Sequence, residues 1–307
     1  MYGVFDMKVL VTGSKGQLGS AVVREVASRG CYCIPSYFSN TESQKESLLL
    51  MPYVKLDITD AQSVRYVMKK FAPDVVIHCA AWTDVEGAEK FENVENVKSV
   101  NVRGTENIVT AARLINAKLI YISTDYVFGG GGEEPWKPDD KNFDPLNFYG
   151  QTKLEGELIV SNILEKYFIV RTEWLFGQNG NNFVKKMIAK GSVCNTVKVV
   201  SDQIGTPTYT EDLAKLLVDM SYSEKYGYYH ATNEGGYVSW YDFCLEIYKL
   251  YGLKTMVLPV SGKEYTSFNA KRPCNSRFDK SKLIKNGFDL LPSWQNALCR
   301  YLKEKEF

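Results

Sequence analysis

A glycine-rich turn near the start of the chain is the feature that most limits its fold. Three glycines form it, Gly13, Gly16 and Gly19; an apolar run at Lys8–Thr12 precedes the turn, and a helical pattern over 18–28 follows it. In such a spacing the first glycine permits a tight turn, the second a close approach of a phosphate, and the third close packing of helix on strand. An ordinary strand-to-helix loop is the alternative. The strand and helix on the correct sides favour a dinucleotide-binding turn.

Apolar, β-branched runs alternate with longer amphipathic stretches over the first 170 residues. Strands are expected at 8–12, 31–36, 53–56, 74–79, 118–123 and 167–170, with helical patterns at 59–71, 101–116 and 150–162. Such βα repetition predicts an α/β fold with a doubly wound, Rossmann-like parallel sheet. We expect residues 1–170 to form the dinucleotide-binding domain.

The pattern loosens after Arg171 into shorter elements. Helices are expected at 182–190 and from Glu211, Ser239 and Ser293, with a strand at 197–200. We expect residues 171–307 to form mainly a smaller C-terminal substrate-binding domain over the carboxyl edge of the sheet, with some elements returning to the sheet. The segment 129–148, rich in glycine, proline and aspartate, predicts a long surface loop, which is a frequent setting for functional residues.

Composition restricts the class of ligand. The 307 residues include 37 lysines and arginines against 36 aspartates and glutamates, a formal charge of +1 with no long basic stripe. We therefore expect a small-molecule ligand rather than a nucleic acid. Seven cysteines without a Cys-x-x-Cys pair fit buried thiols in a reducing cytosol. No leader and no membrane span is evident, so we expect a cytoplasmic protein, with residues 1–6 as a short extension.

A tyrosine and a lysine four residues apart, Tyr149 and Lys153, are the candidate catalytic pair. The same spacing occurs at Tyr66 and Lys70 and again at Tyr301 and Lys305, so spacing alone carries little weight. The first pair opens a predicted helix next to the loop described above, and at i, i+4 its side chains share one helix face. A lysine ammonium beside a phenol lowers the pKa of that phenol, so we expect Lys153 to tune Tyr149 as a proton donor.

Two residues at the end of the preceding strand complete the candidate centre. The hydroxyl of Thr124 follows the run 118–123 and is expected to hydrogen-bond a substrate carbonyl beside the phenol. A threonine that caps a turn is the alternative. Asp125 follows directly and has the same alternative as a turn residue.

Several segments together resemble the extended short-chain dehydrogenase/reductases, and more narrowly the dTDP-4-dehydrorhamnose reductase family within them. These segments are Thr12–Gly19, Ser123–Phe128, Tyr149–Gly156, Arg171–Gly177, Gly180–Phe183, Asp202–Thr208, Ser239–Asp242 and Arg272–Ser276. The resemblance runs from Lys8 almost to the C-terminus. It implies reduction of the C4 keto group of a nucleotide-linked 6-deoxy-4-ketohexose, most simply dTDP-4-dehydro-L-rhamnose to dTDP-L-rhamnose, with a nicotinamide hydride.

The resemblance also implies roles for individual residues. Tyr149 is the catalytic acid, with Lys153 and Thr124 completing the triad, and both Tyr149 and Lys153 contact the cofactor. The implied substrate contacts are Thr124, Asp125, Trp174, Asn182 and Arg272, although core packing is the commoner role for a tryptophan. The implied cofactor contacts are Gly13, Lys15, Gly16, Gln17, Leu18, Gly19, Asp57, Ile58, Ala80, Ala81, Trp82 and Thr83.

The cofactor is expected to be NADP or NAD, with NADPH mildly preferred. A sheet that prefers NADH usually ends its second strand with an acid that accepts the ribose 2′-hydroxyl, and the segment 34–39 contains none. The ammonium of Lys15 is a candidate partner for a 2′-phosphate, with a solvated loop lysine as the alternative. Asp57 is expected to accept a hydrogen bond from adenine and Ile58 to pack on its ring, with a strand-ending aspartate as the alternative.

Departures from the family pattern leave other functions open. Family members carry a glutamate of a magnesium-linked dimer contact where this chain has Ala21, so magnesium is doubtful and a homodimer is one possibility. No metal site is predicted, since His78 and His230 lack ligand companions and fit structural histidines. Glu173 adds a charge beside Trp174. The alternatives are another nucleotide-sugar 4-ketoreductase and a non-catalytic dinucleotide-binding regulatory subunit.

Overall fold

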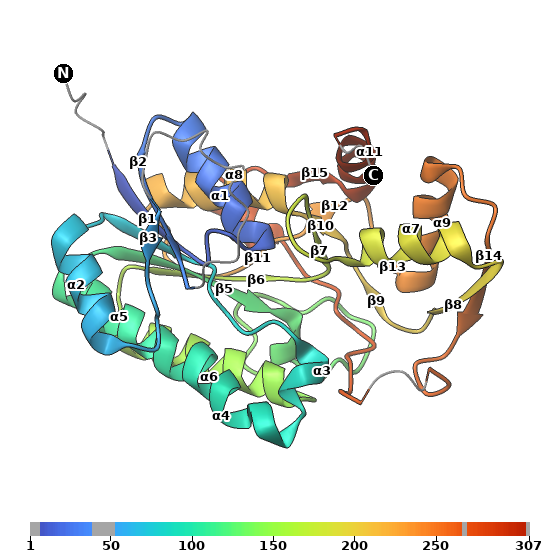
Figure 1. The fold of residues 1–307 in the computed structure, drawn as a ribbon, viewed down its shortest axis with the longest axis horizontal. Coiled ribbons are helices and arrows are strands. Elements are labelled where there is room, and N and C mark those ends of the chain that lie inside the picture. The colour runs from blue at the N-terminus through green and yellow to red at the C-terminus, as the bar shows by residue number, and fades with distance from the viewer. Residues whose placement is uncertain (1–6, 39–52, 266–268, 305–307) are drawn as a thin grey trace.

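The computed structural model describes residues 7–38, 53–265 and 269–304. A seven-stranded sheet forms its centre, in the order β11-β6-β5-β4-β1-β2-β3, and every neighbouring pair is parallel (Figure 1). These strands are β1 Lys8–Thr12, β2 Tyr32–Tyr37, β3 Val54–Lys55, β4 Val75–His78, β5 Lys118–Thr124, β6 Tyr167–Thr172 and β11 Gly227–His230. The predicted Rossmann-like sheet is confirmed, and its strand order reverses between β1 and β4, where such sheets bind ligands.

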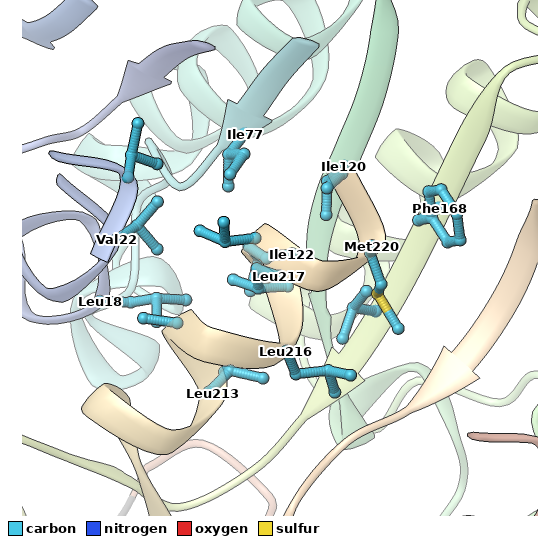
Figure 2. Packing of buried hydrophobic residues seen from close by; sticks show 14 of the residues in the cluster. Leu18, Val22, Ile77, Ile120, Ile122, Phe168, Leu213, Leu216, Leu217 and Met220 are labelled. Atoms are coloured by element: carbon cyan, nitrogen blue, oxygen red, sulfur yellow. The ribbon is translucent and has the colours of Figure 1, made fainter. Parts of the chain in front are cut away.

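Helices cover both faces of this sheet (Figure 1). On one face lie α1 Gln17–Ser28 and α8 Thr210–Tyr222, and on the other lie α2 Ala61–Phe71, α5 Thr105–Leu114 and α6 Phe148–Ile163. Figure 2 shows the first face, where Leu18 and Val22 of α1 and Leu217 of α8 pack against Ile77 and Ile120 of the strands. Alternate strand residues supply the two cores, as the two-residue period of a strand requires.

A third core belongs to the C-terminal part of the chain. It is built from α7 Phe183–Val193, α9 Trp240–Tyr251 and α11 Trp294–Lys303, with β8 Thr196–Val200 paired in parallel to β14 Met256–Val260. The remaining strands are β7 Leu175–Phe176, β9 Ile204–Gly205, β10 Thr208–Tyr209, β12 Asn233–Glu234, β13 Val238–Ser239 and β15 Leu291–Ser293. The remaining helices are α3 Val85–Ala88, α4 Val94–Lys98, α10 Ser281–Lys285, short 3-10 turns at 91–93 and 125–127, and a π-helical stretch at 99–104.

Up to the start of α6 at Phe148, the segment 129–148 is a long loop without helix or strand, mostly exposed or half-buried, and a few of its side chains anchor it to the rest of the molecule. Trp136 stacks on Phe128 with ring centres 4.5 Å apart, and it pairs with Phe278 through an isolated β-bridge. Arg171, buried in β6, donates to the carbonyl oxygen of Pro138. The loop is therefore held against the sheet edge by aromatic packing, which its glycine- and proline-rich composition did not indicate.

Candidate active site

The glycine turn is closely packed on the sheet. Gly13 has φ +64°, and a Cβ on it would lie 2.8 Å from Cα of Ala80, while a Cβ on Gly19 would overlap the carbonyl oxygen of Gly13. A side chain at Gly16 would meet that same oxygen at 3.1 Å. Glycine is thus required here because the turn packs closely on the start of the β4–α3 loop and on itself; we call this turn, Gly13–Gly19, the cradle.

Helix α1 begins in this cradle without a side-chain cap, because Gly16 stands at its N-cap position. The N–H groups of its first turn therefore have no acceptor within the helix. Together with the helix dipole they favour an anion, such as a pyrophosphate, at this end.

A cavity of about 640 Å³ runs from the turn across the carboxyl ends of β1, β4, β5 and β6. It brings together most of the predicted residues: Gly13, Lys15, Gly16, Gln17, Leu18, Gly19, Ala80, Ala81, Thr83, Thr124, Asp125, Tyr149, Lys153 and Trp174. The expected dinucleotide end and the expected substrate end are thus two ends of one space.

Five predicted residues do not line this cavity, and one of them is Trp82, whose indole N–H donates to the carbonyl oxygen of Asp84 at 2.9 Å. Asp57 accepts hydrogen bonds from the backbone N–H and the hydroxyl of Thr59, and Ile58 is buried in the core shared by α2 and α5. Asn182 caps α7 by accepting from the N–H of Lys185, and Arg272 pairs with Glu86 at 2.9 Å. Each has a structural role here, and their ligand roles stay predictions.

Tyr149 is the second residue of α6, which Asn147 caps by accepting a hydrogen bond from Gly150 at 2.8 Å. Its ring meets that of Tyr126 edge to face, with centres 5.7 Å apart. Burial raises the pKa of the Tyr149 phenol, and Asp125 and Tyr126 raise it further, whereas a hydrogen bond with Thr124 lowers it. In this environment the phenol is protonated at neutral pH, and it lines the cavity.

Lys153, which is expected to tune this phenol, is buried. The ammonium lies 4.1 Å from the centre of the Tyr121 ring, one helical turn from Tyr149. Burial lowers the pKa of Lys153 to about 7, against the opposing influence of Glu157 and Cys79. Burial disfavours charge on both groups in the structure without ligands, and the lowering of the pKa of Tyr149 by Lys153 stays a prediction.

Asp125 lies at the carboxyl end of β5 and is 3% exposed. It accepts hydrogen bonds from the hydroxyls of Thr124 at 2.9 Å and Ser276 at 2.5 Å. Burial nevertheless raises the pKa of its carboxyl to about 6. Asp125 thereby holds the Thr124 hydroxyl in place beside Tyr149.

Trp174 forms the opposite wall in an unusual conformation. Its φ is +50°, which is rare for a bulky residue, and its indole stacks on that of Trp240 at 3.7 Å with 15° between the planes. Strained backbone of this kind is found preferentially at functional sites. Both rings line the cavity.

Sequence reasoning missed several residues of the cavity wall. Trp240 belongs to a segment that carried the family resemblance but received no role, and Tyr37 and Phe38 were noted only for the lack of an acid. Cys79 and Glu173 also line the cavity. The position of a residue directly after a parallel strand is the signal that identifies Phe38, Cys79 and Glu173.

The two other tyrosine–lysine spacings lie elsewhere. Tyr66 is 62% exposed on α2, and Tyr301 is buried in α11, where its hydroxyl hydrogen-bonds Asn182. Lys305 lies outside the described residues. Among the described residues of the three pairs, only Tyr149 and Lys153 line the cavity.

Both histidines are buried and hydrogen-bonded. His78 lies between the hydroxyls of Thr12 and Thr105, and His230 contacts the carbonyl oxygen of Trp136. Burial, together with a smaller effect of Lys153, lowers the pKa of His78 to about 3. Within the described ranges, no group of three or more histidine, cysteine or acidic side chains is placed to hold a metal ion.

Three further observations concern Ala21, the cysteines and the helices. Ala21 is fully buried between α1 and the sheet, so this position offers no metal ligand. Of the seven free cysteines, three are buried, two half-buried and two, Cys194 and Cys274, exposed. None of the helices in the described part of the chain has the length and apolar character needed to cross a membrane.

Comparison with known proteins places this architecture in a family. The family model described as RmlD substrate binding domain matches residues 7–307. A dTDP-4-dehydrorhamnose reductase from Aggregatibacter actinomycetemcomitans is 36% identical over 304 residues, covering 95% of this chain and 97% of the relative. The spore coat polysaccharide biosynthesis protein SpsK of Bacillus subtilis is 34% identical, covering 97% and 98%.

A solved structure extends this likeness to three dimensions. The crystal structure of dTDP-4-dehydrorhamnose reductase from Bacillus anthracis in complex with NADP has a TM-score of 0.88 and 38% identity to this chain, covering 98% of this chain and all of that one. The match spans the sheet, the cavity and the C-terminal elements. The chain belongs to the RmlD family of dTDP-4-dehydrorhamnose reductases.

Proposed function

We propose that this chain reduces the C4 keto group of a nucleotide-linked 6-deoxy-4-ketohexose, with dTDP-4-dehydro-L-rhamnose as the first candidate substrate. The single cavity that joins the glycine cradle to Tyr149 carries this proposal, since it holds a dinucleotide site and a proton donor in one space. Family membership supports the choice of substrate.

Three residues of this chain have different roles in the proposed reduction. Tyr149 gives its phenolic proton to the carbonyl oxygen as that oxygen gains negative charge. In the structure without ligands Thr124 donates its single hydroxyl proton to Asp125; when the substrate binds, this hydroxyl turns to donate a hydrogen bond to the same oxygen and fixes its position. The pKa of Lys153 is about 7, so its amine is readily protonated or deprotonated near neutral pH. In its protonated form it places a positive charge near the phenolate that Tyr149 becomes after proton transfer.

The cradle residues fit a nicotinamide dinucleotide. Gly13, Gly16 and the first turn of α1 would hold the pyrophosphate, and Ala80 and Ala81 leave room for the ribose and ring that follow. When bound, the reduced cofactor supplies the hydride that C4 receives. The N-terminal part of the chain is thus proposed as the dinucleotide-binding domain, and the region from Arg171 onward mainly as the substrate-binding domain.

We propose a mild preference for NADPH. Lys15 lines the cavity with its ammonium 4.1 Å from the centre of the Tyr37 ring, at the end of β2, and the segment 34–39 contains no acidic residue that would repel a 2′-phosphate. Steady-state assays with both cofactors on the wild type and on Lys15→Ala test this. NADPH should be used at least as well as NADH, and the variant should lose part of that advantage; a strong NADH preference unchanged in Lys15→Ala would contradict it.

The cytosol is the proposed place of action, because seven free thiols suit a reducing compartment. A homodimer is proposed without a metal bridge, since Ala21 is buried.

The decisive experiment is turnover of a panel of nucleotide 4-ketosugars by the purified chain, followed as cofactor oxidation. The proposal expects reduction of dTDP-4-dehydro-L-rhamnose at a higher kcat/KM than the other members. Reduction of a different member would identify another nucleotide-sugar 4-ketoreductase. Cofactor binding without turnover of any member would instead identify a regulatory binding subunit.

A further inference from the structure

Trp174 and Trp240 form a stacked pair in the wall of the cavity. Trp174 follows β6 by two residues and Trp240 is the first residue of α9, so the fold brings together two segments that are distant in the chain. Their indole centres are 3.7 Å apart with 15° between the planes, and both residues are half-buried and line the cavity. The pair is therefore reached from the space proposed for the ligands.

The unusual conformation of Trp174 is fixed by contacts from separate segments. A φ of +50° is costly for a bulky residue and persists only where the surroundings impose it. The carbonyl oxygen of Trp174 accepts a hydrogen bond from the backbone N–H of Thr208 at 3.2 Å. Gly205 leaves the space that the indole occupies, since a Cβ on it would lie 2.9 Å from Cε2 of Trp174. Trp240 then covers one face of the same ring.

Trp240 has both of its own faces covered. Phe183, the first residue of α7, lies against it with ring centres 4.4 Å apart and 46° between the planes. Two rings this close to one indole must lie on opposite faces, so Phe183 covers the face that Trp174 leaves free. Only the edge of Trp240 then faces the cavity. Because stacking on a base or a sugar ring uses the face of an aromatic residue, Trp240 contributes little surface to a ligand directly.

We propose that Trp240 is a positioning residue, which backs the indole of Trp174 and holds it in its left-handed conformation, so that Trp174 presents a rigid aromatic surface to the nucleotide sugar. The proposal rests on the proposed function, because it takes a nucleotide sugar as the ligand of this wall. The antiparallel pairing of β13 with β9 supports it, since this pairing brings Gly205 and Trp240, which follows Ser239 directly, to the same indole. A wall that is ordered before binding costs less to order when the ligand arrives.

The stack has a signature that needs no ligand. Two indoles in contact couple their electronic transitions, which gives two bands of opposite sign in the far-ultraviolet circular dichroism spectrum. Trp240→Met fills much of the space without a flat ring and should abolish these bands, as should Trp174→Ala. Trp294→Met is the matched control and should retain them, because Trp294 belongs to the same core but packs on Phe243. Bands that persist in Trp240→Met would overturn the proposal.

The effect of the stack on binding is measured by titration calorimetry with dTDP-L-rhamnose in the presence of NADP, and with NADP alone. Trp240→Met should weaken binding of dTDP-L-rhamnose by about tenfold and leave NADP binding within about twofold, because only the substrate wall loses its support. Trp240→Phe keeps a ring against Trp174 and should recover most of the affinity. Trp294→Met should change neither titration.

A double variant separates positioning from direct contact. Trp240→Met combined with Trp174→Ala should bind dTDP-L-rhamnose no more weakly than Trp174→Ala alone, since a positioning residue has no effect once the residue it holds is gone. A further loss in the double variant would show that Trp240 contacts the ligand itself, and would overturn the proposal.

Two other results would also overturn it. Unchanged affinity for dTDP-L-rhamnose in Trp240→Met would show that Trp174 needs no support, and equal weakening of NADP would show a general loosening of the cavity. If Trp240→Met does not fold, Phe183→Leu decides the question, because it loosens Trp240 from the other face: a selective loss supports the proposal, and unchanged affinity overturns it. Failure of the proposed function appears separately, as absence of wild-type turnover across the ketosugar panel.

Discussion

At the scale of single residues, the active centre depends on burial more than on a charged pair. The Tyr149 phenol stays protonated because burial and the neighbouring Asp125 raise its pKa, and Lys153 is partly discharged because burial outweighs the charge of Glu157. A bound ligand that supplies negative charge would restore the ammonium of Lys153. The protonation states of Tyr149 and Lys153 therefore both depend on the charge of the ligand bound in the cavity.

Replacement of Tyr149 by phenylalanine removes the proton donor and leaves the ring in place. We expect kcat to fall by about a hundredfold to ten-thousandfold while dinucleotide affinity is retained, because general acid catalysis is worth that much. The measurement is steady-state turnover together with a cofactor titration. Near wild-type turnover in Tyr149→Phe would refute the assignment.

Tyr66→Phe is the matched control and should be neutral, since Tyr66 is 62% exposed on the outer side of α2. Tyr301→Phe is a poorer control than the spacing alone suggested. Its hydroxyl is buried and hydrogen-bonds Asn182 at 3.3 Å, so this variant should lose stability.

Replacement of Trp174 by alanine tests the substrate wall. We expect weaker sugar-nucleotide binding, by on the order of one to a few kcal/mol, with little change in cofactor affinity, because the Trp174–Trp240 stack lines the cavity beyond the cradle. Trp174→Phe should recover part of the loss because it retains an aromatic face. Calorimetry with each ligand provides the measurement, and equal losses for both ligands would identify a packing tryptophan.

At the scale of elements, two glycines at the ends of α1 have different reasons to be glycine. Gly13 and Gly30 both have positive φ, +64° and +71°. Space is open around Gly30, whereas a Cβ on Gly13 would lie 2.8 Å from backbone atoms of Ala80. The positive φ alone therefore explains why residue 30 is glycine. At residue 13 glycine is required both by the positive φ and by the close approach of the turn to Ala80.

This pair yields a matched prediction. Gly30→Ala should lower the free energy of unfolding by about 1 to 2 kcal/mol, the cost of a left-handed conformation for alanine. Gly13→Ala should lower it by more and should also weaken cofactor binding, because the β1–α1 turn must move away from β4. Urea unfolding and a fluorescence titration with NADPH measure the two effects. Equal losses in the two variants would show that close approach at Gly13 has no energetic weight.

Elements with a strong period were predictable, and those defined by distant partners were not. The strand at Lys8–Thr12 and the helix over residues 59–71 were expected at almost the observed positions, because apolar spacing and capping residues are local signals. The sequence gives no comparable signal for β11 at Gly227–His230, which is defined by pairing with β6. Likewise Glu173 and Trp240 meet in the cavity only through the fold, as residues from different elements.

At the scale of the whole molecule, both histidines of the chain are buried in the folded state. Burial lowers the pKa of His78 to about 3 and that of His230 well below its ordinary value. As the pH falls below about 6.5, both histidines bind protons in the unfolded chain but stay neutral in the folded protein. The free energy of unfolding therefore decreases with acidification. Asp125, with a pKa raised to about 6, opposes this by taking up a proton in the folded state.

The expected outcome is a difference between pH profiles. Between about pH 7 and pH 5 the wild type should lose about 2 kcal/mol more unfolding free energy than His78→Gln, which has no ring to protonate. Urea unfolding of the two proteins at both pH values measures this difference. Because the comparison is of changes with pH, a variant that is less stable at neutral pH remains informative, and parallel profiles would refute the role of His78.

The edge strand β11 has a consequence for how the protein is made. When a ribosome has released the chain through Thr172, six strands of the central sheet exist, and β6 lies at an open edge with its backbone groups unpaired. Its partner follows about 60 residues later, after α7 and α8, which corresponds to several seconds of synthesis at roughly 5–20 residues per second. During that interval the nascent chain exposes a template for strand addition. Chaperone binding during translation should therefore be concentrated on intermediates that end between Thr172 and His230, and should decline once β11 has emerged.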